Sequence, residues 1–259
     1  MEKKLVFFDI DGTLLDGEKR LPLSTKQAVK ALKESDVEVA IATGRAPFMF
    51  KELLEELEID SFVSFNGQYV VYKGDVIYKN PIDQKIIAEL ENYTSDKNHP
   101  LVFQDHLGMK ANYESHPHID TSINSLKIGH YPTYDAAYYK NREIYQILLF
   151  CEEHDEKQYS DRFSELSFIR WHHYSADVLP LGGSKAVGIQ RMLERIDVKK
   201  ENVYAFGDGL NDIEMLQFVG QGIAMGNAAK VVQEAADLVT KDVKEEGIPY
   251  GLKLAGLLS

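Results

Sequence analysis

The sequence of 259 residues has little cysteine and tryptophan, few basic side chains and no long hydrophobic run. Its one cysteine, Cys151, excludes an intrachain disulfide, and we expect this side chain to be a small buried apolar group. The 29 basic residues are outnumbered by 41 acidic ones, and the formal net charge of -12 opposes binding to nucleic acid or to an anionic membrane. The apolar run at residues 5–8 is too short for a signal peptide or a membrane span. We therefore expect a cytoplasmic protein with no nucleic-acid and no membrane partner.

What is present is typical of a globular chain, with 44% hydrophobic and 27% charged residues. Near the amino terminus, short apolar runs alternate with stretches of helical periodicity. These patterns predict strands at residues 5–10, 37–42 and 62–65, and helices at residues 25–35 and around residues 48–57. Ser24 and Gln27 resemble a capping box at the start of the first helix. The alternation predicts an α/β fold with a Rossmann-like, doubly wound parallel sheet, where ligands bind beyond the carboxyl ends of the strands.

The same alternation returns in the last third of the chain. Ser184 is a candidate cap for the first helix there, and later helices are predicted at residues 211–219, 228–236 and 247–258. The predicted strands lie at residues 203–206, 222–225 and 238–240. In the first third, Asn66 and Gly67 precede two short antiparallel strands, at residues 68–72 and 76–78, which we expect at the edge of the sheet.

The pattern differs between residues 81 and 182. An Asn-Pro pair at residues 80–81 and a Pro-Leu-Gly-Gly stretch at residues 180–183 mark its ends, and all eight histidines and Trp171 fall between them. The segment has candidate strands at residues 101–104, 144–150 and 168–171, and candidate helices at residues 83–93 and 155–165. We therefore predict that residues 1–80 and 183–259 form one core domain, which is interrupted by an inserted α+β domain at residues 81–182.

Acidic residues follow two of the predicted strands. Asp9 and Asp11 are spaced by two, so both carboxylates leave the end of the first strand on the same side. Asp208 and Asp212 flank a loop after a later strand. Several hard oxygen ligands at one edge of a sheet suit Mg²⁺ together with a substrate phosphate.

Groups that bind phosphate are expected at the same edge. The Thr43 hydroxyl, the Gly44 amide and the Lys185 ammonium can each hold phosphate oxygens. An anionic substrate of an acidic protein needs such local donors and cations. The combination predicts a site where carboxylates, a metal ion and phosphate donors meet.

Four segments, in this order and spacing, resemble the four motifs of phosphatases of the haloacid dehalogenase superfamily. They are Asp9-Ile10-Asp11-Gly12-Thr13, Thr43-Gly44-Arg45, Lys185, and Gly207-Asp208-Gly209-Leu210-Asn211-Asp212. The insertion between the second and third motifs, and residues 64–67, are similar to Cof-type sugar-phosphate phosphatases with a large cap. The resemblance covers essentially the whole chain and is strongest in the core.

This resemblance implies a Mg²⁺-dependent phosphomonoester hydrolase acting on a small phosphorylated metabolite, with sugar phosphates as the expected class. Asp9 would be the nucleophile that becomes an aspartyl-phosphate. Asp11 would protonate the leaving oxygen and then activate water, although an unperturbed aspartic acid has a pKa of about 3.9, so desolvation by the cap would have to raise the pKa of this carboxyl group. The implied metal ligands are Asp9, the Asp11 backbone carbonyl, Asp208 and Asp212, the last through water or by supporting Lys185. The implied phosphate-binding residues are Ile10 through its amide, Thr43, Gly44, Lys185 and Asn211.

Several alternatives remain open at this stage. Arg45 contacts the substrate or forms a plain surface salt bridge. The pairs His116/His118 and His172/His173 suggest zinc, but they lack cysteine and a supporting ligand spacing. The tyrosines at positions 131, 134, 138, 139 and 145 stack a sugar or pack the insert.

Two other functions share parts of this chemistry. A phosphosugar mutase would use the same aspartyl-phosphate but return the phosphoryl group to the substrate. A signalling receiver would also use an aspartate, Mg²⁺, a threonine and a lysine, but it is a single domain of about 120 residues without an insert. The substrate and the oligomeric state do not follow from the sequence.

Overall fold

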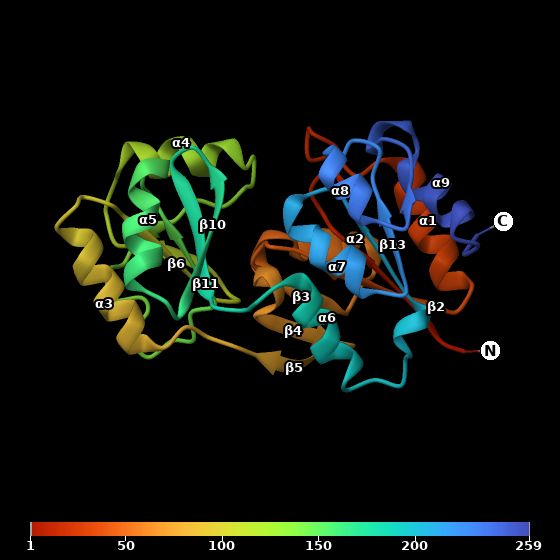
Figure 1. Cartoon of the computed structure of the whole chain (residues 1–259), viewed down its shortest axis with the longest axis horizontal. Helices are drawn as coiled ribbons and strands as arrows, with labels where there is room; N and C mark the ends of the chain where they lie inside the picture. The colour runs from red at the N-terminus through yellow and green to blue at the C-terminus, as the bar shows by residue number, and fades with distance from the viewer. Residues whose placement is uncertain (1, 259) are drawn as a thin grey trace. The chain divides into compact units, whose positions relative to one another are not determined.

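Figure 1 shows the computed structural model of the chain, which describes residues 2–258. The chain divides into two compact units. The core unit comprises Met1–Gly44, Glu52–Lys79 and Ser184–Ser259, and the inserted unit comprises Arg45–Lys51 and Asn80–Gly183. Across residues 2–258, every helix is too short or too polar to cross a membrane.

An eight-stranded sheet forms the centre of the core unit. Its strands are, in spatial order, β14 (Leu238–Val239), β13 (Gln221–Ala224), β12 (Val203–Gly207), β1 (Lys4–Phe8), β2 (Val37–Ala42), β3 (Phe62–Ser64), β4 (Tyr69–Tyr72) and β5 (Asp75–Lys79). The strands from β14 to β3 are parallel, whereas β4 and β5 are antiparallel. The prediction of a Rossmann-like parallel sheet with an antiparallel edge is therefore confirmed.

The strand order reverses between β1 and β12. From β1 the chain proceeds through β2 to β3 in one direction, and from β12 through β13 to β14 in the other. In a doubly wound sheet this switch point opens a crevice at the carboxyl ends of the strands. The loops that follow β1 and β12 therefore border the place where a ligand binds.

Helices cover both faces of the core sheet. The helices α6 (Lys185–Leu193), α7 (Ile213–Phe218) and α8 (Lys230–Ala235) bury residues such as Ile189 and Met215 against Leu5 and Phe7. The helices α1 (Leu23–Glu34) and α9 (Gly247–Leu254) contact each other, and α1 also contacts β2. The helix α2 (Lys51–Leu57) and the short helices η1 (Pro47–Met49), η2 (Phe65–Gly67), η3 (Lys200–Asn202), η4 (Leu210–Asp212) and η5 (Val243–Glu245) complete the connections.

Two helix ends of the core unit differ from the prediction. The proposed capping box at Ser24 is wrong, because α1 begins at Leu23 and its N-cap is Pro22, which offers no side-chain acceptor. The last helix, α9, ends at Leu254 rather than at residue 258. Gly256 has a φ of 65° and Leu257 donates its N–H to the Leu252 carbonyl at 2.9 Å, which is a Schellman ending that the sequence reading overlooked.

The inserted unit is built on a six-stranded sheet with the order β10 (Leu166–His172), β11 (Ser175–Pro180), β9 (Gln146–Leu149), β6 (Leu101–Gln104), β7 (Met109–Ala111) and β8 (Thr133–Tyr134). The helices α3 (Gln84–Ser95) and α5 (Glu153–Arg162) bury Leu90 and Tyr159 on one face, and α4 (Pro117–Ser125) buries Ile119 on the other. This unit is the α+β insert expected from the sequence, although β7, β8, β11 and α4 were not predicted.

Two expectations from the sequence concern the burial of Cys151 and of the tyrosines in the inserted unit. Cys151 is buried in the cluster that contains Leu90 and Tyr159, so the prediction of a small buried apolar group is confirmed. Of the tyrosine run, Tyr138 and Tyr139 are buried in the same cluster, whereas Tyr131 and Tyr134 are about half exposed.

Candidate active site

The loops after three neighbouring strands carry polar side chains, which are buried at Asp9 and Thr43 and partly buried at Asp208. Asp9 follows β1, Thr43 follows β2 and Asp208 follows β12. Two backbone hydrogen bonds continue the sheet at this edge: Asp9 donates to the Phe206 carbonyl at 2.9 Å and Thr43 to the Val63 carbonyl at 2.9 Å. The exposed fraction is 6% for Asp9 and 1% for Thr43, so the site is set into the end of the sheet.

Lys185 lies at the same edge of the sheet, although it is far from Asp9 in the sequence. It is the first residue of α6, whose N-cap, Ser184, accepts a hydrogen bond from the Val187 amide at 3.4 Å and confirms the predicted cap. The Lys185 side chain is 1% exposed, and its Nζ lies 2.6 Å from Asp9 Oδ1 and 2.6 Å from Asp212 Oδ1. One buried ammonium group therefore joins the carboxylates of two different loops.

Hydrogen bonds within the loop after β12 fix the Asp212 carboxylate, and side chains of two other loops fix that of Asp208. Asp212 is fully buried, and its Oδ2 accepts from the backbone amides of Asp208 at 3.0 Å and Gly209 at 2.8 Å. Asp208 Oδ1 accepts from the Thr13 hydroxyl at 3.1 Å, and Asp208 Oδ2 accepts from Asn227 Nδ2 at 3.2 Å. These contacts orient both carboxylates, and the contribution of Asn227 had no signal in the motifs.

Three carboxylates of this site are close enough to hold one metal ion. Asp9, Asp208 and Asp212 each offer an oxygen, and these atoms all lie within 4.8 Å of one another. Within residues 2–258 no other group of three or more histidine, cysteine, aspartate or glutamate side chains meets this condition. Carboxylate oxygens are the ligands of hard divalent cations, so the chemistry of the donor set fits a metal ion.

His116, His118 and His172 contact residues of the inserted unit itself. His116 accepts the N–H of His118 at the start of α4, and the ring of His118 stacks on that of Tyr174 with the centroids 4.3 Å apart. His172 Nδ1 lies 2.9 Å from the Ser122 hydroxyl. Burial lowers the pKa of His116 and of His172, which favours their neutral forms.

Burial of so many acids shifts their proton affinities. Desolvation raises the pKa of Asp9 to about 8. The positive charge of Lys185 lowers this pKa, and the negative charge of Asp212 raises it, but desolvation is the largest cause. Desolvation also raises the pKa of Asp208 to about 6. Desolvation disfavours the charged form of Lys185, but Asp212 and Asp9 outweigh it, so the pKa of Lys185 lies above its usual value. A cation held by the carboxylates would favour their ionised forms.

Asn66 connects the residues that are predicted to bind phosphate. Its side-chain Oδ1 accepts from Asn211 Nδ2 at 3.1 Å, and its backbone N–H donates to the Thr43 carbonyl at 3.1 Å. A Cβ atom on Gly44 would lie 3.0 Å from Asn66 Nδ2, so the two residues are in close contact. The sequence placed Asn66 in a turn and in the segment 64–67 that is similar to Cof-type phosphatases, but it predicted none of these contacts. Its φ of 49° is a left-handed conformation that asparagine tolerates better than most residues.

Glycine is required at position 12, which follows the two acids of the first motif and packs against the Asp208 side chain. Gly12 has a φ of 79°, and a Cβ atom there would lie 2.1 Å from Asp208 Oδ2. Its carbonyl accepts from Asn227 Nδ2 at 2.9 Å. Asp11 lies just before this turn, and its Oδ1 is 2.5 Å from the Nζ of Lys19, a cation that the motif analysis did not include.

The core unit therefore brings together seven of the predicted site residues: Asp9, Thr43, Gly44, Lys185, Asp208, Asn211 and Asp212. Ile10 is buried next to Asp9, and its carbonyl accepts from the Leu15 amide at 2.8 Å. Arg45 is the first residue of the segment that groups with the inserted unit, and its contact with substrate stays a prediction.

A family model for haloacid dehalogenase-like hydrolases matches residues 6–252, which is nearly the whole chain. The chain belongs to this family. YkrA of Bacillus subtilis (strain 168), a phosphatase by name, is 49% identical to this hydrolase over 258 residues and all of both chains.

Solved structures agree with this assignment. The crystal structure of a hypothetical protein from Geobacillus kaustophilus HTA426 has a TM-score of 0.95 and 56% identity, and it covers 99% of this chain and 100% of its own. The sugar phosphatase BT4131, of subclass IIB of the superfamily, has a TM-score of 0.86 and 32% identity over 99% of this chain and 100% of its own. The hydrolase is thus a phosphatase with the fold that its motifs predicted.

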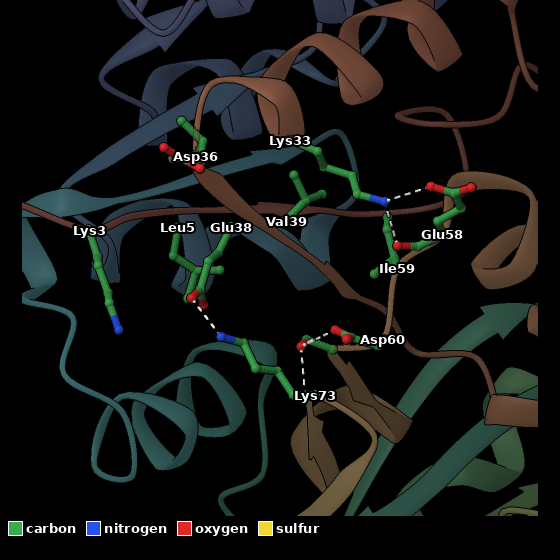
Figure 2. Close-up of a pocket in the computed structure, with 12 residues that line it drawn as sticks. Lys3, Leu5, Lys33, Asp36, Glu38, Val39, Glu58, Ile59, Asp60 and Lys73 are labelled. Atoms are coloured by element: carbon green, nitrogen blue, oxygen red, sulfur yellow. Dashed lines mark hydrogen bonds and ion pairs between the residues drawn. The ribbon is translucent and has the colours of Figure 1, made fainter.

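A cavity of about 440 Å³ in the hydrolase lies away from these residues, at the amino ends of the core strands, and Figure 2 shows its lining. Two of the three lysines that line it point at acidic partners: Lys73 Nζ is 3.0 Å from Glu38 Oε1, and Lys33 Nζ is 3.4 Å from Glu58 Oε2. Because these two cations already have acidic partners, the cavity is a weaker candidate for binding a substrate anion than the carboxyl end of the sheet.

Proposed function

We propose that this phosphatase hydrolyses small phosphomonoesters, sugar phosphates above all, through an aspartyl-phosphate on Asp9 and with Mg²⁺ as its metal. The observation that carries the proposal is the buried Lys185 ammonium, 2.6 Å from both Asp9 and Asp212, beside a third carboxylate, Asp208. A buried nucleophile next to a fixed cation is the arrangement that lets an anion attack an anionic phosphoryl group.

In the first step a carboxylate oxygen of Asp9 forms a bond to phosphorus while the bond between phosphorus and the leaving oxygen breaks. Asp11 gives its proton to that leaving oxygen. In the second step water attacks phosphorus, Asp11 takes a proton from it, and the bond to Asp9 breaks. Inorganic phosphate and the free alcohol are the products, so the enzyme returns to its starting state.

The metal would be held by the carboxylates of Asp9 and Asp208 and by the Asp11 backbone carbonyl, with Asp212 as a further ligand or as the support of Lys185. When bound, the ion supplies positive charge that offsets the charge on the phosphoryl oxygens. Three hard oxygen donors without nitrogen or sulfur favour Mg²⁺ over a transition metal.

The phosphoryl oxygens would be held by Lys185, by the Thr43 hydroxyl, by Asn211 and by the amides of Ile10 and Gly44. Asn66 supports this role, because its contacts with Thr43, Gly44 and Asn211 fix the two loops against each other. The similarity to the sugar phosphatase BT4131 supports sugar phosphates as the substrate class.

The test is phosphate release from a panel of sugar phosphates and nucleotides, measured with Mg²⁺ and with EDTA. The panel compares the wild type with Asp9→Asn and with a matched control, Asp36→Asn. Asp36 is exposed and has a φ of 57°, a conformation that asparagine accepts. We expect release that depends on metal, is lost in Asp9→Asn and is unchanged in the control.

Phosphate release that survives in Asp9→Asn, or that continues in EDTA, would contradict the proposal. An isomeric phosphate formed without free phosphate would instead identify a mutase. A phosphoprotein that persists for hours after treatment with a phosphodonor would indicate a signalling role.

A further inference from the structure

Lys19 is a cation at the edge of the active site that none of the four motifs contains. Its Nζ lies 2.5 Å from Oδ1 of Asp11, with the two side chains 27% and 38% exposed. Asp11 is the residue to which the proposed function gives the proton transfer. A cation in direct contact with that carboxyl group determines how it is oriented.

The turn at residues 16–20 holds Lys19 in place. Asp16 Oδ1 accepts the backbone N–H groups of Glu18 at 2.8 Å and Arg20 at 3.0 Å, and the Asp16 amide donates to the Arg20 carbonyl at 3.0 Å. The Lys19 amide donates to the Asp16 carbonyl at 2.9 Å. The turn is therefore closed by its own hydrogen bonds, independently of the Lys19 side chain.

A second set of bonds orders residues 10–15, which link the active-site acids to this turn. Gly12 donates its N–H to the Leu15 carbonyl at 2.9 Å, Leu15 donates to the Ile10 carbonyl at 2.8 Å, and Asp11 and Leu15 form an isolated β-bridge. Lys19 and Asp11 are thus carried by one hydrogen-bonded segment of the core unit.

The contact is not explained by stability. Ion pairs between partly exposed side chains contribute little to folding because solvent screens them. Lys19 also has a φ of 60°, a backbone conformation that disfavours a lysine relative to glycine or asparagine. Other lysines of the chain share these two properties, but Lys19 differs from them in its partner, because its ammonium group contacts Asp11 at the edge of the active site.

We infer that Lys19 is a positioning residue, which fixes the Asp11 carboxyl group so that Oδ2 exchanges the proton with the leaving oxygen. An ammonium group has three donors and no acceptor, so its bond to Oδ1 is strongest when that oxygen carries no proton. The contact therefore favours the proton on Oδ2, both when Asp11 donates it and when Asp11 takes it from water. This inference rests on the proposed function, in which Asp11 is the acid and base.

The experiment compares Lys19→Met with Lys19→Arg, which keeps a cation. Lys73→Met is the matched control, because Lys73 also lies in a turn with positive φ (50°) and also pairs with an acid, Glu38, but far along the sheet at the cavity of Figure 2. The readout is kcat/KM for two substrates, the sugar phosphate that the wild type hydrolyses fastest and p-nitrophenyl phosphate. The second has a leaving group that departs without a proton.

We expect Lys19→Met to lower kcat/KM about tenfold for the sugar phosphate and less than about twofold for p-nitrophenyl phosphate, because only the first substrate needs an oriented acid. Lys19→Arg should recover most of the loss, and Lys73→Met should match the wild type with both substrates. Asp11→Asn should show the same selectivity to a larger extent. The thermal unfolding midpoints should be unchanged in Lys19→Met, Lys19→Arg and Lys73→Met.

Two outcomes would overturn the inference while the proposed function stands: equal losses with both substrates in Lys19→Met, or no loss with either. A wild-type protein that releases no phosphate from any substrate would overturn the proposed function itself and the inference with it. The two failures are distinguished by the activity of the wild type.

Discussion

Both ends of the core sheet have a cluster of charged side chains, but the two clusters differ in burial and in the balance of charge. At the carboxyl end, Lys185 and Asp212 are each 1% exposed, and the three carboxylates there outnumber the lysine. At the amino end, Lys73 is 54% exposed, pairs with one acid, Glu38, and lies over the ring of Tyr72. Exposed pairs in balance add little to stability, whereas buried charges out of balance carry a desolvation cost that protonation of an acid or a bound cation offsets. The comparison shows that burial and imbalance together, rather than charge itself, distinguish the active site.

We expect the largest difference between the two ends when the stability and activity of Lys185→Met are compared with those of Lys33→Met. Removing the buried ammonium leaves Asp9 and Asp212 without a counter-charge, so we expect a loss of about 3 kcal/mol or more in the free energy of unfolding. Phosphate release should fall about 10²–10³-fold or further. Lys33 is partly exposed at the amino end, so its loss should cost about 1 kcal/mol and leave activity unchanged. Urea denaturation and phosphate release measure both effects, and similar losses in the two variants would contradict the comparison.

A backbone test contrasts the glycines that follow β3 and β4. Gly67 has a φ of 98°, and a Cβ atom there would lie 2.1 Å from the Ser184 carbonyl oxygen, immediately before Lys185. Gly74, at the amino end, has a φ of 82° but no atom within 4 Å of an added Cβ. We expect Gly67→Ala to lower the free energy of unfolding by about 3 kcal/mol and Gly74→Ala by about 1 kcal/mol. Equal values from denaturant titration would show that the contact with Ser184 relaxes freely.

The smallest effect concerns the metal. If Mg²⁺ binds only the folded protein, a concentration about 100 times its Kd should add about 2.7 kcal/mol to stability. This gain should disappear in Asp208→Asn and persist in Asp60→Asn, whose carboxylate lies at the amino end and accepts from the Ser61 hydroxyl. Thermal unfolding with and without Mg²⁺ gives the comparison. A gain that persists in Asp208→Asn would place the ion elsewhere.

The parts of the fold that could be predicted are those with a strong periodic signal. The strand at residues 37–42 was predicted with its observed bounds, because a run that is apolar except for Glu38 ends in Thr-Gly-Arg. By contrast, β7 and β8 have three and two residues, too few for a period to be read. The helix α4 begins with Pro117 and has a weak apolar stripe, and it was missed for this reason.

The same division holds for the candidate site. The acids after β1 and β12 and the lysine at the start of α6 lie at positions that the parallel topology alone brings together, so the sequence could place them. Asn227 and Lys19 could not be placed, because their contacts with Asp208 and Asp11 depend on how two loops fold back. The roles of these residues in the reaction stay predictions, since a contact shows position and not chemistry.

The points at which the chain leaves and re-enters the core unit have a consequence for how such enzymes diversify. Gly44 is the last residue of the core unit before residues 45–51, which belong to the inserted unit, and Ser184 is the first core residue after residues 80–183. The helix that begins with Lys185 therefore starts one residue after the chain returns to the core unit. The contacts that join Lys185 to Asp9 and Asp212 are made entirely within the core unit. A different insert can therefore replace residues 80–183 without rewriting these contacts. The two parts of one gene can then evolve at different rates, with the insert diverging while the catalytic half is held constant.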